Sequence, residues 1–308
     1  MNQTGANGGN PLPDPLPDPL PISEPDLRAI ERTAVELARV AGAEIMSALG
    51  RTLSIRYKGA DAATDAATDA AIGTTFKDPV SEIDHKVEVL IRSRLAEDFA
   101  EHDILGEEID ERPGRDHDFV WAIDPIDGTT NFVNGFPLFA GSIGVLYRGC
   151  PIVGAVWCST SHALRVGVYH ARHGGSLCFD EEPIEMKVNP ALRRRLAGEP
   201  QAISDRDLPW DIRKTGSAAI ECAFVAASLL RVARFERPNV WDVAGGIALV
   251  RAAGGDVRVR DAAGWVPLER FEPPASAAGT PPDLRDWRRP VILGEPDAVA
   301  LLCRAHGP

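Results

Sequence analysis

The stretch from Trp121 to Phe132 constrains this chain more than any other, because it ends an apolar run with two acids and a turn of small residues. Asp124 and Asp127 stand three positions apart, and a Gly-Thr-Thr turn follows them. Carboxylates are ligands for hard divalent cations, and Mg²⁺ usually shares substrate phosphate oxygens as well. Backbone N–H groups at such a turn bind phosphate. The stretch therefore predicts metal-assisted phosphate chemistry, although Asp-Pro and Asp-Gly pairs also occur in ordinary turns.

Acids recur in three other segments. Glu107 and Glu108 follow the apolar pair Ile104-Leu105, which is typical of the end of a strand. Asp242 opens a helix of small and apolar residues, and Asp84 precedes an amphipathic helix. Each of these two aspartates also suits a plain helix cap. Four acidic segments in this order favour one shared site.

With these segments together, the chain resembles the inositol monophosphatase family of magnesium-dependent, lithium-sensitive phosphatases. The resemblance covers roughly residues 25–295, and it rests on segments 78–84, 106–108, 121–132 with Gly135 and Pro137, 216–219, 241–245 and 253–255. It implies a phosphoric monoester hydrolase with a mixed α and β fold, a layered αβαβα sandwich of the sugar-phosphatase type.

The resemblance also implies a set of metal ligands. Glu107, Asp124 and the carbonyl of Ile126 match the ligands of a first ion. Asp124, Asp127 and Asp242 match those of a second, so that Asp124 bridges the two. Glu107 also matches a ligand to a third, weaker ion. We therefore expect two to three Mg²⁺ ions in each site.

Catalytic and phosphate-binding roles follow from the same resemblance. Asp84 and Thr129 match the pair that orients the attacking water, so Asp84, Thr129 and Glu107 are the expected catalytic residues. The N–H groups of Gly128 and Thr129 match the phosphate seat. Direct in-line attack by a metal-activated water needs no protein nucleophile, because phosphoryl transfer depends on positioning and charge stabilisation.

The substrate side is less closely matched. Ser217 and Ala218 correspond to the substrate-side turn of the family. An acid seven places before the Trp-Asp aspartate contacts substrate hydroxyls in inositol monophosphatases, but Phe235 stands there in this chain. Glu236, one place further on, is the candidate replacement.

Inositol monophosphate or a related polyol or sugar phosphate ranks first as substrate. The Thr-Thr-Asn-Phe ending of the metal loop favours this branch over nucleotide phosphatases with Thr-Lys-Glu-Phe. Histidinol phosphate and fructose 1,6-bisphosphate are the alternatives. A non-catalytic regulatory protein that binds metal and phosphate is a hypothesis of a different class, because fold does not fix function.

Composition bounds the remaining possibilities. The 308 residues are 44% apolar and 25% charged, as in globular proteins. We expect a disordered Pro-rich tail over 1–24, an α+β half over 25–150 with most metal ligands, and an α/β half over 151–308 that completes the site. The formal charge of −12 argues against nucleic-acid binding, which needs basic patches.

Partners and location follow from the same sequence. The five scattered cysteines are typical of reduced thiols in a cytoplasmic protein. Neither a signal peptide nor an apolar run of membrane-spanning length is present, so we expect no membrane association. The partner is a small phosphorylated metabolite, and the resemblance implies a homodimer.

Hydrophobic periodicity gives the expected elements. Helices are predicted over 24–49, 87–99, 217–230 and 243–250, and strands over 53–57, 118–124, 139–147, 151–158, 164–170, 176–180, 201–204 and 232–235. The Asp-Ala-Ala-Thr repeat at 61–71 suggests a flexible lid near the metals. Lys58 and Lys77 compete for the lysine that helps hold metal or phosphate there, and neither is assigned.

Overall fold

The computed structural model describes residues 20–51, 53, 55–57, 79–115, 117–184, 191–192, 195–200, 208–275 and 281–307. The described helices are α1 (Glu24–Ala48), α3 (Glu82–Asp98), α4 (Thr129–Val133), α5 (Ala218–Ala226), α6 (Val240–Ala252) and α7 (Pro296–Ala305), with a 3-10 turn η1 (Leu284–Asp286). The predictions on the tail up to residue 19, on Lys58, Lys77 and the 61–71 repeat, and on a strand at 201–204 lie outside these ranges.

The strands form two large sheets and one small pair. The larger sheet has the order β3 (Asp103–Gly106), β4 (Phe119–Asp127), β5 (Ala140–Tyr147), β6 (Cys150–Cys158), β7 (Gly167–Arg172), β8 (Cys178–Phe179) and β9 (Glu182–Pro183). The second has the order β11 (Trp210–Arg213), β10 (Arg195–Gly198), β12 (Val232–Phe235), β15 (Val291–Gly294), β13 (Asp256–Asp261) and β14 (Gly264–Pro267). Strands β1 (Ile55–Tyr57) and β2 (Pro79–Ser81) pair separately.

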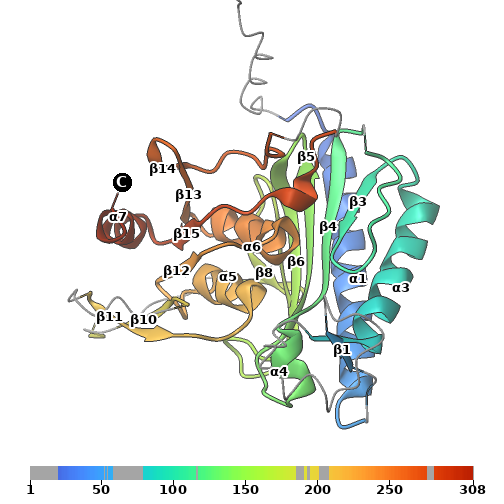
Figure 1. Ribbon diagram of the computed structural model, residues 1–308, viewed down its shortest axis with the longest axis horizontal. Coiled ribbons are helices and arrows are strands. Elements are labelled where there is room, and N and C mark those ends of the chain that lie inside the picture. Colours follow the sequence, from blue (N-terminus) through green and yellow to red (C-terminus); the bar gives the residue numbers. More distant parts are fainter. Residues whose placement is uncertain are drawn as a thin grey trace, which may run out of the picture.

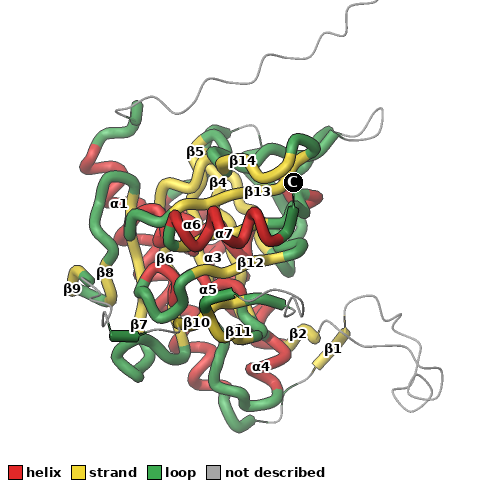
Figure 2. The backbone as a smooth tube through the Cα atoms, turned by 90° about the vertical axis from the view of Figure 1, so that its left-hand side faces the viewer, coloured by secondary structure: helices red, strands yellow, loops and turns green. Residues whose placement is uncertain are grey.

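These elements stack as five layers, which confirms the predicted αβαβα sandwich (Figure 1). Helices α1 and α3 cover one face of the larger sheet, and α5 and α6 lie between the two sheets. Helix α7 covers the outer face of the second sheet, and Figure 2 views the molecule from that side. The sandwich places the middle helices in contact with apolar side chains on both sides.

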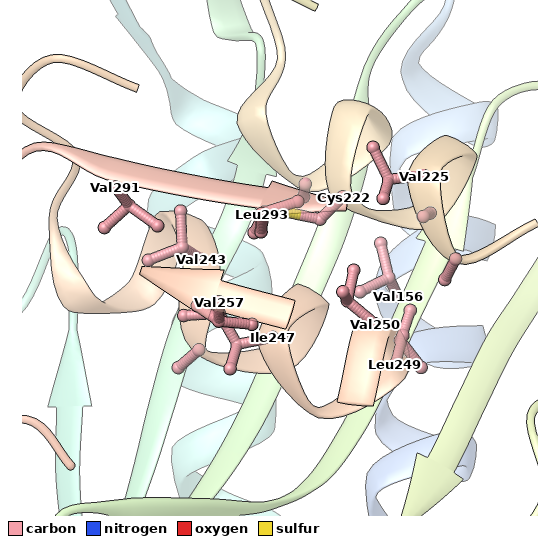
Figure 3. Packing of buried hydrophobic residues seen from close by; sticks show 14 of the residues in the cluster. Val156, Cys222, Val225, Val243, Ile247, Leu249, Val250, Val257, Val291 and Leu293 are labelled. Atoms are coloured by element: carbon pink, nitrogen blue, oxygen red, sulfur yellow. The ribbon is translucent and has the colours of Figure 1, made fainter. Parts of the chain in front are cut away.

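Helix α6 shows why the sequence folds this way. Nearly all its residues are apolar or small, and such a helix is stable only when it is buried all round. Its side chains pack against α5 and against strand β13 (Figure 3), with Val243, Ile247 and Val250 among the buried contacts. On the other side it lies against glycines of the larger sheet. A Cβ added at Gly154 would stand 2.1 Å from the Gly245 carbonyl oxygen, so no side chain fits between the two backbones. This direct backbone contact fixes the distance of α6 from the larger sheet.

Most predicted elements are present, and the differences have local causes. The helix expected to reach residue 230 ends at Ala226, because Ser228 takes a left-handed conformation with φ of 57°. The strand expected from residue 164 begins at Gly167, since Leu164 is left-handed and 89% exposed. Strand β4 continues past Asp124 to Asp127. The division at residue 150 stays a prediction; that position opens β6, next to β5 in one sheet.

An aromatic cluster under the start of β4 contains a histidine held in its neutral form. The ring of His102 stacks on Phe119 with centroids 4.5 Å apart, and its Nδ1 accepts a hydrogen bond from the Trp121 indole at 3.0 Å. Burial, with the nearby His117 charge, lowers the pKa of His102 to about 4. Protonation would also remove the acceptor that Trp121 needs.

This pKa predicts a loss of stability in acid. The unfolded chain binds a proton on His102 near pH 6.5, but the folded chain binds it only near pH 4, so stability is present above pH 6.5 and falls as pH drops through that window. Solvent reaches part of the ring, so we expect the cost to be about 1–2 kcal/mol. The free energy of unfolding of His102→Gln, measured with urea, should depend less on pH between 6.5 and 4 than that of the wild type. The glutamine amide oxygen can still accept the hydrogen bond from Trp121. The exposed His173→Gln is the control, and equal pH profiles for both variants would contradict the assignment.

Candidate active site

The predicted metal and phosphate residues line one cavity of about 210 Å³. Its walls come from the end of β3, from β4, from the turn into α4 and from the start of α6. The lining residues are Glu107, Asp124, Ile126, Asp127, Gly128, Thr129, Thr130, Gly216, Asn239 and Asp242. Three of the four acidic segments, some of them more than 100 positions apart in the sequence, therefore line one cavity, and the fourth is linked to it through the contact of Asp84 with Thr129.

A bulge in β4 turns both of its aspartates into this cavity. Side chains alternate along a strand, so residues three positions apart normally face opposite sides of a sheet. Asp124 lies opposite Ser142 and Asp127 lies opposite Ala140, and the register shifts between these two pairs. A bulge of this kind redirects a side chain. Next to it, β3 runs parallel to β4, and the Glu107 N–H donates to the Ile123 carbonyl at 3.2 Å.

Asp242 and Asp84 are candidate site residues that also belong to the capping boxes of their helices. Asp242 is the third residue of α6, and its carboxylate accepts the Asn239 N–H at 2.7 Å. Asp84 holds the same position in α3 and accepts the Ser81 N–H at 2.9 Å. The N-caps are Asn239 and Ser81, so the prediction that Asp242 and Asp84 are themselves caps was wrong, and each aspartate instead has the N3 role in a capping box. This role does not compete with a functional one, because each carboxylate is fixed in direction by its own helix.

The predicted water-orienting pair is in contact. The Thr129 hydroxyl lies 3.1 Å from Asp84 Oδ1 and 2.8 Å from the Ile126 carbonyl oxygen. Thr129 lines the cavity, whereas Asp84 is buried behind it. Burial raises the pKa of Asp84 to about 6, with a smaller contribution in the same direction from Glu107.

Ser217 and Ala218 hold Asp127 in place. The Ser217 hydroxyl donates to Asp127 Oδ2 at 2.6 Å, and the N–H groups of Ala218 and Ala219 also bond to this carboxylate. Ser217 is at the same time the N-cap of α5. Their predicted contact with substrate stays a prediction, and the structure adds this second role.

The carboxylates of the cavity repel one another. Burial raises the pKa of Asp124 well above its ordinary value, and the charges of Glu107, Asp127 and Asp242 raise it further. Burial is also the main cause that raises the pKa of Asp242 to about 8 and that of Asp127 to about 6. Asp124 Oδ1 is buried without a hydrogen-bond partner. A set of buried acid oxygens with an unpaired member fits a bound cation, which would neutralise them.

As they stand, these side chains do not yet surround a common point. Within the described ranges, no three Asp, Glu, His or Cys side chains converge closely enough to hold one ion. Asp127 is turned toward Ser217, and Asp242 is turned toward Asn239. Binding of an ion to the whole set therefore requires the carboxylates to turn toward it.

A second cavity of about 200 Å³ adjoins the first and shares Gly216 and Asp242 with it. The remaining lining residues are Pro200, Lys214, Ser217, Ala218, Glu221, Arg234, Phe235, Glu236 and Pro238. All three predicted substrate residues are among them. Lys214 and Arg234 were not predicted from the sequence. A feature that could have indicated Arg234 is its charge within the otherwise apolar strand β12.

Arg285 is another residue that the sequence did not reveal. Its guanidinium donates to the carbonyls of Gly106, Glu107 and Ile109. From the opposite side, the Glu88 carboxylate accepts the N–H groups of Glu108 and Ile109 at 2.7 and 3.2 Å. The loop that presents Glu107 is therefore held by a cation on its carbonyls and by an anion on its N–H groups.

The same guanidinium reaches the other wall of the site. Its central carbon lies 5.2 Å from the centroid of the Trp241 ring. Trp241 directly precedes Asp242 in the sequence. Cation–π contact adds to the hydrogen bonds. Arg285 thereby links the segment of Glu107 to the segment of Asp242.

Arg285→Met should loosen the position of Glu107 without removing a ligand. We expect activity to fall about 10–100-fold, as for other changes behind a metal ligand, and the metal concentration for half-maximal activity to rise. Arg289→Met is the matched control, since Arg289 pairs with Asp261 and the Arg260 carbonyl. Metal titrations of activity check the prediction, and an equal metal requirement in both variants would refute it.

Fold and site together define a metal-dependent phosphatase that acts on a small phosphate ester. The model of the Inositol monophosphatase family matches residues 26–278. The chain therefore belongs to the inositol monophosphatase family.

None of its described helices is long and apolar enough to cross a membrane.

Individual relatives agree with this assignment. The chain is 31% identical over 254 residues to an inositol-1-monophosphatase from Synechocystis, covering 78% of this chain and 82% of that protein. It is 30% identical over 194 residues to a fructose-1,6-bisphosphatase/inositol-1-monophosphatase from Aquifex aeolicus, covering 58% and 71%. The crystal structure of the suppressor protein suhB from Bartonella henselae has the same fold, with a TM-score of 0.68 at 24% identity over 91% of this chain and 98% of that one.

Proposed function

We propose that this phosphatase hydrolyses inositol monophosphate or a related polyol or sugar phosphate with the help of Mg²⁺. One observation carries the proposal. A cavity walled by Glu107, Asp124, Asp127 and Asp242 adjoins a second cavity that contains Glu236. The first suits a phosphate with its counter-ions, and the second suits the hydroxyl-bearing part of a small substrate.

The residues that would hold the metal are those of the acidic cavity. The carboxylates of Glu107, Asp124, Asp127 and Asp242 and the Ile126 carbonyl provide oxygen ligands only, which favours Mg²⁺ over softer metals. When bound, two to three Mg²⁺ ions would polarise phosphate oxygens and lower the pKa of a coordinated water.

The chain itself would orient the reactants. Thr129 and Asp84 are in hydrogen-bond contact, so a water at Thr129 can be aligned and its proton accepted by this pair. Gly128 and Thr129 line the same cavity, where their N–H groups would donate hydrogen bonds to a phosphate. Glu107, the third predicted catalytic residue, lines the wall next to Asp124.

The nearby thiols do not suit covalent catalysis. Cys158 and Cys222 are buried, and burial raises the pKa of both, with a further contribution from Asp127. A thiol is a nucleophile only as the thiolate. Direct attack by water on phosphorus is therefore the mechanism that we propose.

A sugar bisphosphate is the second candidate substrate, because the exposed cation Lys214 lines the second cavity. The name of the Aquifex relative includes such an activity. Histidinol phosphate has no comparable support in the described residues. The homodimer and the cytoplasmic location stay predictions, and the five cysteines are free thiols.

Asp124→Asn tests the metal site directly. The exchange removes a buried charge from a repelling group, so the chelated protein should unfold at the same temperature as the wild type or higher. Metal binding, measured by calorimetry, should weaken, and activity should fall by more than the roughly 100-fold that changes behind a ligand can cost. An Asp124→Asn protein with wild-type metal affinity and rate would exclude the proposed site.

Phosphate release from a substrate panel tests the activity. The panel contains inositol 1-phosphate, fructose 1,6-bisphosphate, histidinol phosphate and 3′-phosphoadenosine 5′-phosphate, each with Mg²⁺, with chelator, and with added Li⁺. We expect inositol 1-phosphate to be hydrolysed fastest, only with Mg²⁺, and with inhibition by Li⁺. Faster hydrolysis of another compound would contradict the substrate, and equal rates with chelator would contradict the metal.

A further inference from the structure

The second cavity contains an ion pair that the proposed function does not yet use. Arg234 is almost fully buried, with its side chain only 6% exposed, and it forms an ion pair with Glu236 at the cavity. Glu236 is itself 58% exposed. A buried cation thus meets a largely solvated acid at the place where the part of the substrate beyond the phosphate would lie.

Arg234 is fixed from below by a second acid. The Glu199 carboxylate is fully buried, and its Oε2 lies 3.6 Å from Arg234 Nε. This distance is too long for a hydrogen bond, and Nε has no hydrogen-bond partner. Glu199 is thus a charge partner of Arg234. Removing Glu199 would leave a buried cation less compensated, so Glu199 helps to keep the guanidinium in place.

The pair also fixes Glu236. A glutamate with an exposed side chain normally samples many rotamers, which costs entropy when it binds a ligand. A charge-assisted bond to a buried guanidinium restricts that freedom in advance. A carboxylate accepts hydrogen bonds and donates none, so the fixed group suits substrate hydroxyls.

The charges around the cavity do not favour a second acidic group on the substrate. The cations that line it are Lys214 and Arg234, and the acids at or behind it are Glu199, Glu221 and Glu236, besides Asp242 of the metal cavity. The guanidinium of Arg234 already faces two of these acids. An entering carboxylate or phosphate would be repelled by the charge of Glu236 and would find the charge of Arg234 already compensated, so that the exposed Lys214 is the cation of this lining left to attract it.

We propose that the Arg234–Glu236 pair determines specificity: Arg234 positions Glu236 to accept substrate hydroxyls, and the pair discriminates against phosphate esters that carry a second acidic group. The inference rests on the proposed function and specifies its substrate class. Arg234 is a positioning residue, since it acts through Glu236.

Two matched pairs of substrates test the inference. Glucitol 6-phosphate and gluconate 6-phosphate share a carbon chain and differ by a carboxylate, whereas fructose 1-phosphate and fructose 1,6-bisphosphate differ by a phosphate. The measured quantity is the ratio of kcat/KM for the acidic member to that for the neutral member. Glu236→Gln should raise this ratio about tenfold or more in both pairs, because it removes the repelling charge and frees Arg234.

Variants of Arg234 should act on the neutral substrates. Arg234→Met should raise KM for glucitol 6-phosphate about tenfold with a smaller change in kcat, as expected when a substrate contact is lost, and Arg234→Lys should restore part of the loss. Arg231→Gln is the control on the neighbouring position, because Arg231 pairs with Glu295 and Asp297 and does not line the cavity. If Arg234→Met does not fold, the Glu199→Gln/Arg234→Met double variant removes both buried charges.

The outcomes separate the two proposals. A wild type that hydrolyses the neutral esters, with ratios unchanged in Glu236→Gln, overturns the specificity role and leaves the proposed function standing. Equal loss on all four esters in Arg234→Met also overturns it, since that result is expected of a purely structural residue. A wild type that hydrolyses neither these four esters nor inositol 1-phosphate with Mg²⁺ overturns both proposals.

Discussion

Mutual repulsion among buried carboxylates is the constraint on which the rest of this structure depends. Asp124 and Asp127 are buried and Asp242 is half-buried, all close to Glu107, and the pKa of each of the three aspartates is raised, chiefly by burial and further by the neighbouring charges. Such a group is costly for a fold to keep unless something positive is bound there. The surrounding elements can be understood as devices that hold the repelling groups together.

The features that hold the acids in place come from the larger sheet, from the middle helix α6 and from the 3-10 turn η1. The bulge of β4 turns Asp124 and Asp127 to one side, and the parallel neighbour β3 ends where Glu107 is needed. Helix α6 lies against the backbone of the larger sheet at Gly154, which sets the position of Asp242. Arg285 links the two walls from outside. Each of these contacts fixes the backbone that carries one or two of the repelling acids.

The family resemblance predicted the layers, and local patterns located the elements and the acidic segments. Apolar periodicity locates helices and strands, and the Asp124 and Asp242 segments carry their own turn and cap signals. Arg285 was missed, since the Glu107 carbonyl to which it donates is distant in the sequence and no local pattern indicates that contact. Arg234 was missed although a charge in an apolar strand was a signal, since its buried partner Glu199 is likewise distant. The late start of β7 was missed for a similar reason: the left-handed Leu164 breaks a pattern that looks regular in sequence.

The most direct test of the account is a crystal structure grown with Mn²⁺ in place of Mg²⁺, with anomalous diffraction used to locate the metal. The account predicts anomalous peaks in the acidic cavity, with Asp124 shared between two ions and with Glu107, Asp127 and Asp242 turned toward them. A well-ordered cavity without any anomalous peak at millimolar Mn²⁺ would contradict the proposed metal site. In that case the four acids would have to be stabilised by protonation alone, and the phosphatase chemistry would need another site.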